Sequence, residues 1–166
     1  MTDPVHRVRV ERNRLRFAAA HMATFGGTCE PLHGHNYDVS VEVEGELSEE
    51  SWVLDFGLLK RLSRAICERL DHRFLLQQHS RLLRAEESAG AWTLRCGTRE
   101  YRLPASDVIV LPIDNSTTEQ LSEWFHGQLS AELLRRGITN VRRLSVGIEE
   151  MPGQSGWYEA DVADSG

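Results

Sequence analysis

The chain has 166 residues, enough for one domain with a hydrophobic core but short for two. Its formal net charge of −6 gives no support to a nucleic-acid partner, and its apolar runs are far too short for a membrane-spanning helix. The first ten residues contain no apolar segment like that of a signal peptide, so we expect a cytoplasmic protein.

The first 45 residues predict two strands joined by a glycine-rich loop over residues 26–31. In the first strand, alternation predicts one face that carries Leu15, Phe17, Ala19 and His21. In the second strand, the corresponding face carries His33, His35, Tyr37, Val39, Val41 and Val43. Both patterns are typical of half-buried strands.

Two helices and a last strand follow. Asp55 is placed to cap a helix whose apolar residues recur at helical spacing over residues 56–70. A second helix is expected to begin at Thr117 in a capping box, Thr-Thr-Glu-Gln, and to stop at Gly137. The last strand alternates, and one of its faces carries Leu144, Val146, Ile148 and Glu150.

Residues 77–110 lie between the helices and are predicted to be an insertion that contains an extra β-hairpin over residues 92–103. The order strand, strand, helix, helix, strand predicts an α+β domain in which both helices cover one face of an antiparallel sheet. There is no internal repeat and no linker, so we expect one domain over residues 1–166 with a flexible tail over residues 161–166.

Three histidines are candidates for a metal site. His33 and His35 alternate along one strand, so both imidazoles project from the same face, and His21 ends the strand expected beside them. Three neutral imidazoles with an open fourth position are typical of catalytic zinc. The alternative is that the histidines are half-buried and only make hydrogen bonds. Gly34, which leaves room for close approach, and the polar loop before His33 favour the metal site.

The three cysteines show no disulfide framework and are expected to be free thiols. Cys29 lies four residues before His33, where a bound cation would lower the pKa of the thiol from about 8.5 and make it a usable base or nucleophile. It could instead be a fourth metal ligand. Cys67 and Cys96 are expected to be packing residues.

Asp71-His72 and Glu150 are further candidates. A histidine at the end of a helix is favoured by the helix dipole, but a carboxylate beside an imidazole can also orient an acid/base group. Glu150 continues the apolar face of the last strand, where a carboxylate needs a partner. A ligand with two parallel N–H donors would be a suitable partner for the Glu150 carboxylate. The alternative is that the strand ends early and Glu150 is solvated like Glu149.

Six short motifs occur in an order that resembles the 6-pyruvoyltetrahydropterin synthase and 6-carboxytetrahydropterin synthase family. The resemblance covers most of the chain, from Phe17 to Tyr158. The motifs are residues 17–21 (FAAAH), 29–37 (CEPLHGHNY), 54–56 (LDF), 70–72 (LDH), 115–119 (NSTTE) and 150–152 (EMP). Each motif is weak alone, but six in this order are specific.

The resemblance implies a tunnelling fold: a four-stranded antiparallel sheet backed by two helices, assembled as a homohexamer of two stacked trimers with active sites between subunits. The Zn²⁺ ligands that it implies are His21, His33 and His35. The catalytic acid/base residues that it implies are Cys29, Asp71 and His72, with Asp71 and His72 coming from a neighbouring subunit. The pterin pocket that it implies is lined by Thr117, Thr118, Glu119 and Glu150, of which Glu150 anchors the pterin.

The implied activity is a zinc-dependent lyase reaction on 7,8-dihydroneopterin triphosphate that gives 6-carboxy-5,6,7,8-tetrahydropterin or a related pterin. Glu30, directly after Cys29, resembles members that form 6-hydroxymethyl-7,8-dihydropterin for folate synthesis, and it is a candidate for a second catalytic residue. Otherwise Glu30 is a solvated loop residue. The pathway, queuosine or folate, stays open. Alternatives of another class are a non-catalytic pterin- or metal-binding protein and an iron oxygenase.

Overall fold

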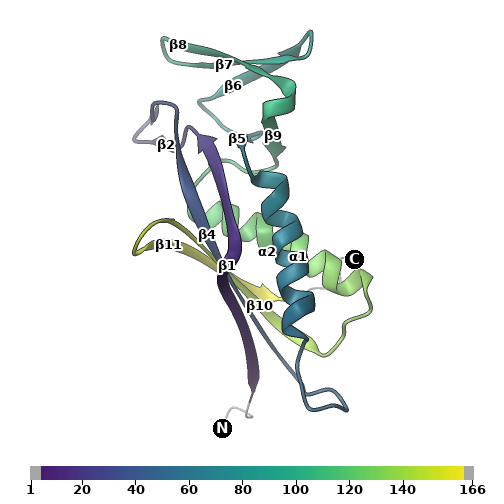
Figure 1. Ribbon diagram of the computed structural model, residues 1–166. Helices are drawn as coiled ribbons and strands as arrows, with labels where there is room; N and C mark the ends of the chain where they lie inside the picture. The colour runs from purple at the N-terminus through teal and green to yellow at the C-terminus, as the bar shows by residue number, and fades with distance from the viewer. Residues whose placement is uncertain (1–4, 163–166) are drawn as a thin grey trace.

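The computed structural model, which describes residues 5–162, confirms an α+β fold with two helices. Its main sheet is larger than predicted and mixed, with strand order β11-β10-β4-β1-β5-β9 (Figure 1). The strands are β1 (His6–His21), β4 (His33–Gly45), β5 (Arg73–Gln77), β9 (Val108–Leu111), β10 (Val141–Met151) and β11 (Gln154–Asp161). The prediction of a four-stranded antiparallel sheet is therefore wrong in extent: β5 and β9 extend it in parallel.

The register of β1 against β4 positions the histidines. His21 pairs with His33, Ala19 with His35, and Ala20 with Gly34. A Cβ atom on Gly34 would lie 2.7 Å from the carbonyl oxygen of Ala19. Glycine between the two histidines is therefore what allows β1 to approach β4 closely at this point.

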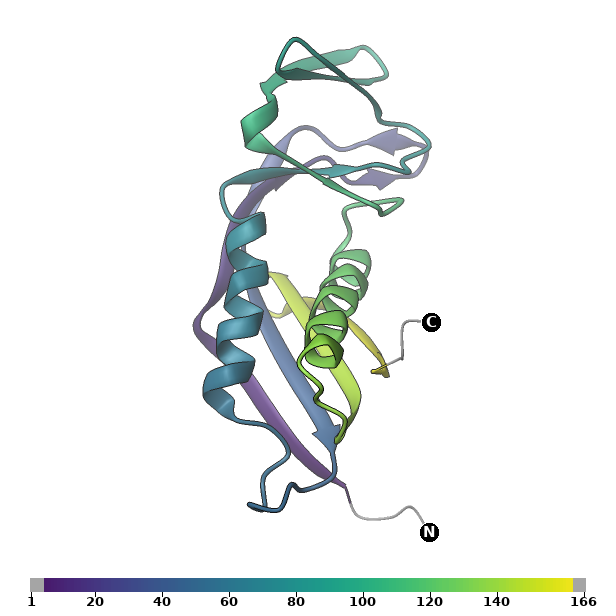
Figure 2. The ribbon, with the colours of Figure 1, turned by 90° about the vertical axis from the view of Figure 1, so that its right-hand side faces the viewer.

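Both helices, α1 (Phe56–Leu70) and α2 (Thr118–Arg135), cover the same face of the sheet (Figure 2). Asp55 caps α1 as predicted, because its Oδ2 accepts a hydrogen bond of 2.6 Å from the Leu58 N–H. Thr117 is the cap of α2, so that helix begins one residue later than predicted. Apolar side chains from α1, α2, β1, β4 and β10 form the main core between helices and sheet.

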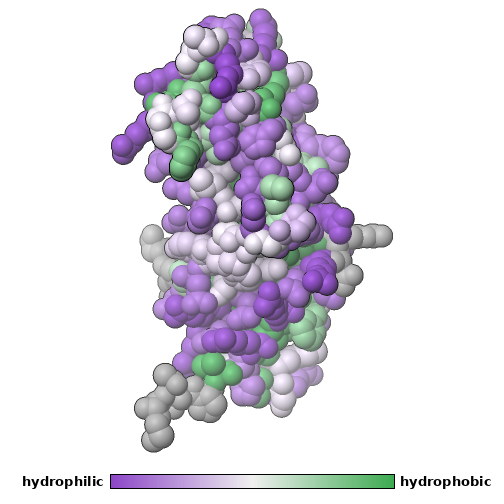
Figure 3. All heavy atoms as spheres, turned by 90° about the vertical axis from the view of Figure 1, so that its left-hand side faces the viewer, coloured by the Kyte–Doolittle hydropathy of each residue, from purple (hydrophilic) through white to green (hydrophobic). Residues whose placement is uncertain are grey.

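The opposite side of the sheet carries the alternate, polar residues of the same strands. Arg7 pairs with Glu44 at 2.9 Å, and Arg16 lies 3.8 Å from Asp38. In Figure 3, hydrophilic and near-neutral residues cover most of this side, and hydrophobic residues form small separate groups. The predicted alternation of the long strands is thus confirmed, with one face in the core and one exposed.

The predicted hairpin is part of a three-stranded antiparallel sheet, with β6 (Arg84–Ser88), β7 (Ala91–Cys96) and β8 (Arg99–Pro104), followed by the short 3-10 helix Ala105–Asp107. We call residues 84–107 the insertion. It lies beyond the end of β1, above the loop that contains β2 (Thr24–Phe25) and β3 (Thr28–Cys29) (Figure 1). A second apolar cluster joins it to the body and contains Met22, Cys29, Phe74, Leu76, Leu83 and Leu94.

Two further expectations need correction. Cys29 and Cys96 form a disulfide, so the prediction that all three cysteines are free thiols is wrong; Cys67 is free and buried. Burial raises the pKa of the Cys67 thiol to about 12.

Asp161 belongs to β11 rather than to the predicted tail, and residues 163–166 of that tail lie outside the described residues. Among the described residues, no helix is long and apolar enough to cross a membrane.

Candidate metal centre

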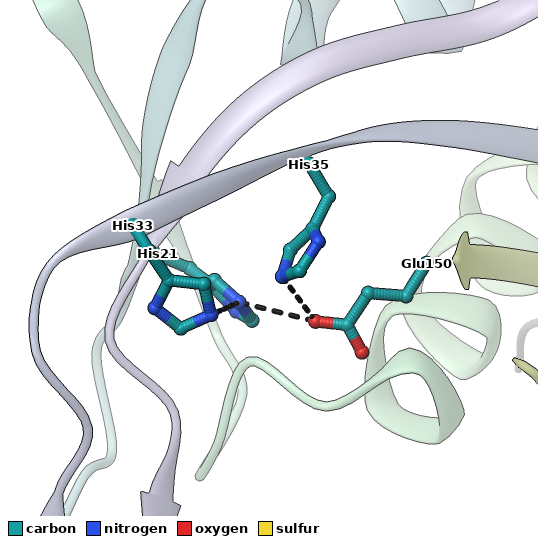
Figure 4. Close-up of side chains that lie close together, drawn as sticks. All are labelled: His21, His33, His35 and Glu150. Atoms are coloured by element: carbon teal, nitrogen blue, oxygen red, sulfur yellow. Dashed lines mark hydrogen bonds and ion pairs between the residues drawn. The ribbon is translucent and has the colours of Figure 1, made fainter.

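Three imidazoles and one carboxylate converge where β1, β4 and β10 meet (Figure 4). His21 Nε2 lies 3.2 Å from His33 Nε2. Glu150 Oε1, from β10, lies 2.7 Å from His35 Nε2 and 3.3 Å from His21 Nε2. The four ligand atoms lie within 4.8 Å of one another. The prediction that the three histidines face one point is confirmed.

Main-chain carbonyls set the tautomer of two of these histidines. The His33 Nδ1–H donates to the Pro31 carbonyl oxygen at 2.7 Å, and the His21 Nδ1–H donates to the Ser116 carbonyl oxygen at 3.0 Å. Because a carbonyl oxygen only accepts, the proton of each neutral ring is on Nδ1 and the lone pair is on Nε2. Two lone pairs and a carboxylate oxygen therefore face each other, an arrangement that a cation between them would stabilise.

Burial favours the neutral form of His21, the form that binds a metal. His21 is 2% exposed, and its burial lowers the pKa of the imidazole, an effect that the neighbouring His33 and His35 reinforce. His35 Nε2 is buried, makes no hydrogen bond among the described residues and lies 2.7 Å from Glu150 Oε1. Two nitrogens on a tetrahedral zinc are about 3.3 Å apart, close to the His21–His33 separation. The donor set therefore fits a metal ion.

The cluster opens into a cavity of about 450 Å³. Besides the histidines, the cavity lining includes Glu30, Thr117, Thr118, Glu119 and Glu150. The structure thus brings the predicted pterin-pocket residues together with the predicted metal ligands. Glu150 lies on the face of β10 that the alternation with Ile148 predicts, and its carboxylate points at the histidines. Sequence reasoning missed that contact and found no cation for Glu150.

Two residues that position the site were not predicted as functional. Ser116 holds His21 through its carbonyl oxygen, and its Oγ lies 3.1 Å from the same Nδ1. The Asn115 side chain accepts from the Thr24 N–H at 2.8 Å and donates to the Thr24 carbonyl at 2.9 Å, which ties β2 to the start of α2. Both residues belong to the motif over residues 115–119, so the motif was the available signal.

Three predicted catalytic residues lie away from this cavity. Cys29 is 2% exposed, is not among the cavity-lining residues and is bonded to Cys96. Asp71 and His72 follow α1, and His72 lines a separate cavity of about 500 Å³ behind the Gly34–His35 segment. Asp71 Oδ1 accepts from the Ala18 N–H at 2.7 Å and its Oδ2 accepts from His72 Nδ1–H at 2.8 Å. These hydrogen bonds, first that from Ala18, lower the pKa of Asp71.

Solved structures and known sequences resemble this chain closely. A structure of 6-pyruvoyltetrahydropterin synthase from Plasmodium vivax matches with a TM-score of 0.89 at 32% identity, over 96% of this chain and 99% of that one. A variant of the same protein, in which a catalytic glutamate is replaced by alanine, matches with the same TM-score at 31% identity.

A protein of Methanocaldococcus jannaschii described as a 6-carboxy-5,6,7,8-tetrahydropterin synthase is 33% identical over 87% of this chain and 89% of its own length. A protein of Pyrococcus furiosus described as a dihydroneopterin monophosphate aldolase is 40% identical over 62 residues, which cover 37% of this chain and 53% of that one. The sequence profile described as 6-pyruvoyl tetrahydropterin synthase matches residues 9–161. The chain therefore belongs to the 6-pyruvoyl tetrahydropterin synthase family.

Proposed function

We propose that this chain is a zinc-dependent lyase that converts 7,8-dihydroneopterin triphosphate to 6-carboxy-5,6,7,8-tetrahydropterin. The observation that carries the proposal is the convergence of three imidazole Nε2 atoms and one carboxylate at a cavity of about 450 Å³. A cavity of this size is typical of small-molecule sites. The description of the M. jannaschii relative, which aligns over most of both chains, supports the product.

The donor set supports zinc as the metal. His21, His33 and His35 would hold the ion, and three nitrogen ligands are typical of zinc but unlike the oxygen ligands that calcium and magnesium prefer. When bound, zinc supplies a Lewis acid that lowers the pKa of a substrate hydroxyl group. The carbonyl partners of His21 and His33 keep both rings oriented for this task.

Glu150 is proposed to bind the amino-pyrimidinone edge of the pterin. Its carboxylate projects from β10 into the cavity, and Thr117, Thr118 and Glu119 line the same cavity at the start of α2. Two parallel N–H donors on the pterin edge match a carboxylate that accepts two hydrogen bonds. Once a metal engages the imidazoles, His35 Nε2 is no longer a partner for Glu150, whose carboxylate then serves the pterin.

Proton transfer is proposed to involve Cys29 in its thiol form together with Asp71 and His72 of a neighbouring subunit. Within one chain, His72 is exposed and Asp71 fixes its Nδ1, which leaves Nε2 for proton transfer. Neither residue lines the cavity of about 450 Å³ at the metal cluster, and His72 lines another cavity, so we propose that assembly brings the pair to the metal cluster of a neighbouring chain. A homohexamer of two trimers with sites between subunits would do so.

A second product is proposed because Glu30 lines the cavity. Its Oε2 lies 3.8 Å from His33 Nε2, and its side chain is 48% exposed. As a base it could remove the proton of the 2′-hydroxyl, so that the C1′–C2′ bond breaks and C2′ and C3′ leave as an aldehyde that carries the triphosphate. A proton added at C1′ then completes 6-hydroxymethyl-7,8-dihydropterin. The P. furiosus relative is described as an aldolase, and the P. vivax protein has a catalytic glutamate, which support a carboxylate in this role.

The test is product identification by mass spectrometry after incubation of zinc-loaded protein with 7,8-dihydroneopterin triphosphate. The proposal predicts 6-carboxy-5,6,7,8-tetrahydropterin together with acetaldehyde and triphosphate, and 6-hydroxymethyl-7,8-dihydropterin as the Glu30-dependent product. The Glu30→Gln variant should lose only the hydroxymethyl product. Tight pterin binding without any turnover would instead assign a non-catalytic binding protein.

A further inference from the structure

The disulfide joins the proposed catalytic thiol to the insertion. Cys29 ends β3 and Cys96 ends β7, and 67 positions separate them in the sequence. A sulfur in a disulfide has neither a proton to give nor a lone pair basic enough to accept one. Cys29 and Glu30 are neighbouring candidate catalytic residues. In the disulfide form Cys29 therefore cannot take part in proton transfer.

Non-covalent contacts hold the insertion against Cys29 as well. Arg99, on β8, donates from Nη1 to the Cys29 carbonyl oxygen at 3.1 Å. Cys29 and Leu94 belong to the same apolar cluster, with Cys96 packed against it. The β3 loop and the insertion therefore contact each other through groups other than the two sulfur atoms.

Glu30 stays available whatever the state of the disulfide. Its N–H donates to the Ala23 carbonyl oxygen at 2.8 Å, so the loop backbone holds it independently of Cys96. Its carboxylate lines the cavity, whereas Cys29 does not. In the disulfide form Glu30, and not Cys29, therefore lines the cavity proposed to hold the substrate.

We propose that the Cys29–Cys96 disulfide is a reversible lock that selects the product. In the oxidised form Glu30 alone directs the reaction, towards 6-hydroxymethyl-7,8-dihydropterin; in the reduced form Cys29 is freed and 6-carboxy-5,6,7,8-tetrahydropterin is formed. This inference rests on the proposed function. Cys96 has no part in either reaction except to block Cys29.

The switching step balances with a dithiol as reductant. Cys96 is partly exposed and Cys29 is buried, so a thiolate of the dithiol attacks the Cys96 sulfur and Cys29 leaves as a thiolate. The second thiol of the reductant then attacks the mixed disulfide and releases Cys96. Two electrons pass to the two cysteines, two protons complete their thiols, and the dithiol becomes a disulfide. The same exchange in reverse, with an oxidised dithiol, restores the lock.

The first test counts thiols without reference to activity. Protein equilibrated with oxidised or reduced dithiothreitol is denatured, alkylated with iodoacetamide and digested for peptide mapping. We expect one alkylated cysteine, Cys67, and a linked Cys29–Cys96 peptide in the oxidised sample, and three alkylated cysteines in the reduced one. A sample without the linked peptide after oxidation would overturn the inference.

The second test compares products from the same two samples. Reduction should raise the ratio of carboxy to hydroxymethyl product by about a hundredfold, the usual effect of one acid/base group, and reoxidation should reverse it. Cys96→Ser should give the reduced ratio under both conditions, while the matched control Cys67→Ser should keep the redox response. If Cys96→Ser does not fold, the reversible response of the natural protein decides the question. Equal ratios in both states would refute only the lock, whereas no product in either state would refute the proposed function and the inference together.

Discussion

Main-chain carbonyls orient two of the three imidazoles of the metal cluster, those of His21 and His33. Each Nδ1–H donor to a carbonyl oxygen directs an unprotonated Nε2 at the centre, and His21 is buried enough to keep its pKa low. The imidazole rings of His21 and His33 are already oriented for a cation in its absence, so cation binding requires little reorganisation of these two side chains.

Replacement of one imidazole tests the ligand set. His33→Ala should lower zinc affinity by about 100-fold, because one ligand of three or four carries about 3 kcal/mol of a typical zinc-binding free energy. The measurement is competition with a chromophoric chelator. His79→Ala, at an exposed histidine away from the cavity, is the matched control and should bind zinc normally. Equal affinities for the two variants would remove His33 from the ligand set.

A substitution at Glu150 distinguishes two roles of this residue, pterin anchor and metal ligand. Glu150→Gln should raise KM by about 30-fold, the cost of about 2 kcal/mol for a lost charge-assisted hydrogen bond, with zinc content unchanged. Glu149→Gln, one residue away and not among the cavity-lining residues, is the control. A fall in zinc affinity with unchanged KM would make Glu150 a ligand instead.

Among the helices and strands, the features that could be predicted are those that depend on residues close together in the sequence. Alternation along β1 and β4 is enough to place His21, His33 and His35 on one face, because the period of a strand is a local property of the sequence. The parallel strands β5 and β9 escaped prediction because they are five and four residues long and pair with segments far away in the sequence. The Cys29–Cys96 disulfide could not be predicted for the same reason, because 67 positions separate the two cysteines in the sequence.

The packing of α2 on β11 gives the protein a pH dependence outside the metal centre. His126 Nε2–H donates to the Ala160 carbonyl at 3.3 Å, and burial lowers the pKa of the imidazole. Below about pH 6.5 the unfolded chain binds a proton that the folded chain resists, so the free energy of unfolding falls as pH falls.

His126→Gln tests this dependence, because glutamine donates a hydrogen bond but does not titrate. In denaturant unfolding of metal-free protein between pH 8 and pH 5, we expect the variant to lose less stability than the natural chain. His6→Gln, at an exposed histidine, should not change the dependence. Parallel curves for the natural chain and His126→Gln would show that His126 does not contribute.

For the whole molecule, the proposed catalytic role of Asp71 and His72 predicts active sites shared between subunits, because neither residue lines the cavity of the metal cluster within one chain. Co-expression of His33→Ala and His72→Ala chains with different tags gives mixed oligomers. If sites are shared between neighbours, these should recover about one quarter of the natural activity, since half of the metal sites are intact and half of their neighbours carry His72. Each variant alone should be inactive. Mixed oligomers without activity, or an active His72→Ala chain, would contradict shared sites.

The central claim, that a zinc ion held by three histidines drives a lyase reaction on a reduced pterin, is tested most directly by titration. Metal-free, reduced protein is titrated with zinc in the presence of 7,8-dihydroneopterin triphosphate, and bound zinc and pterin products are measured on the same samples. We predict that product formation rises in proportion to bound zinc and levels off at about one ion per chain. Product formation that is independent of zinc, or none at full occupancy, would contradict the account.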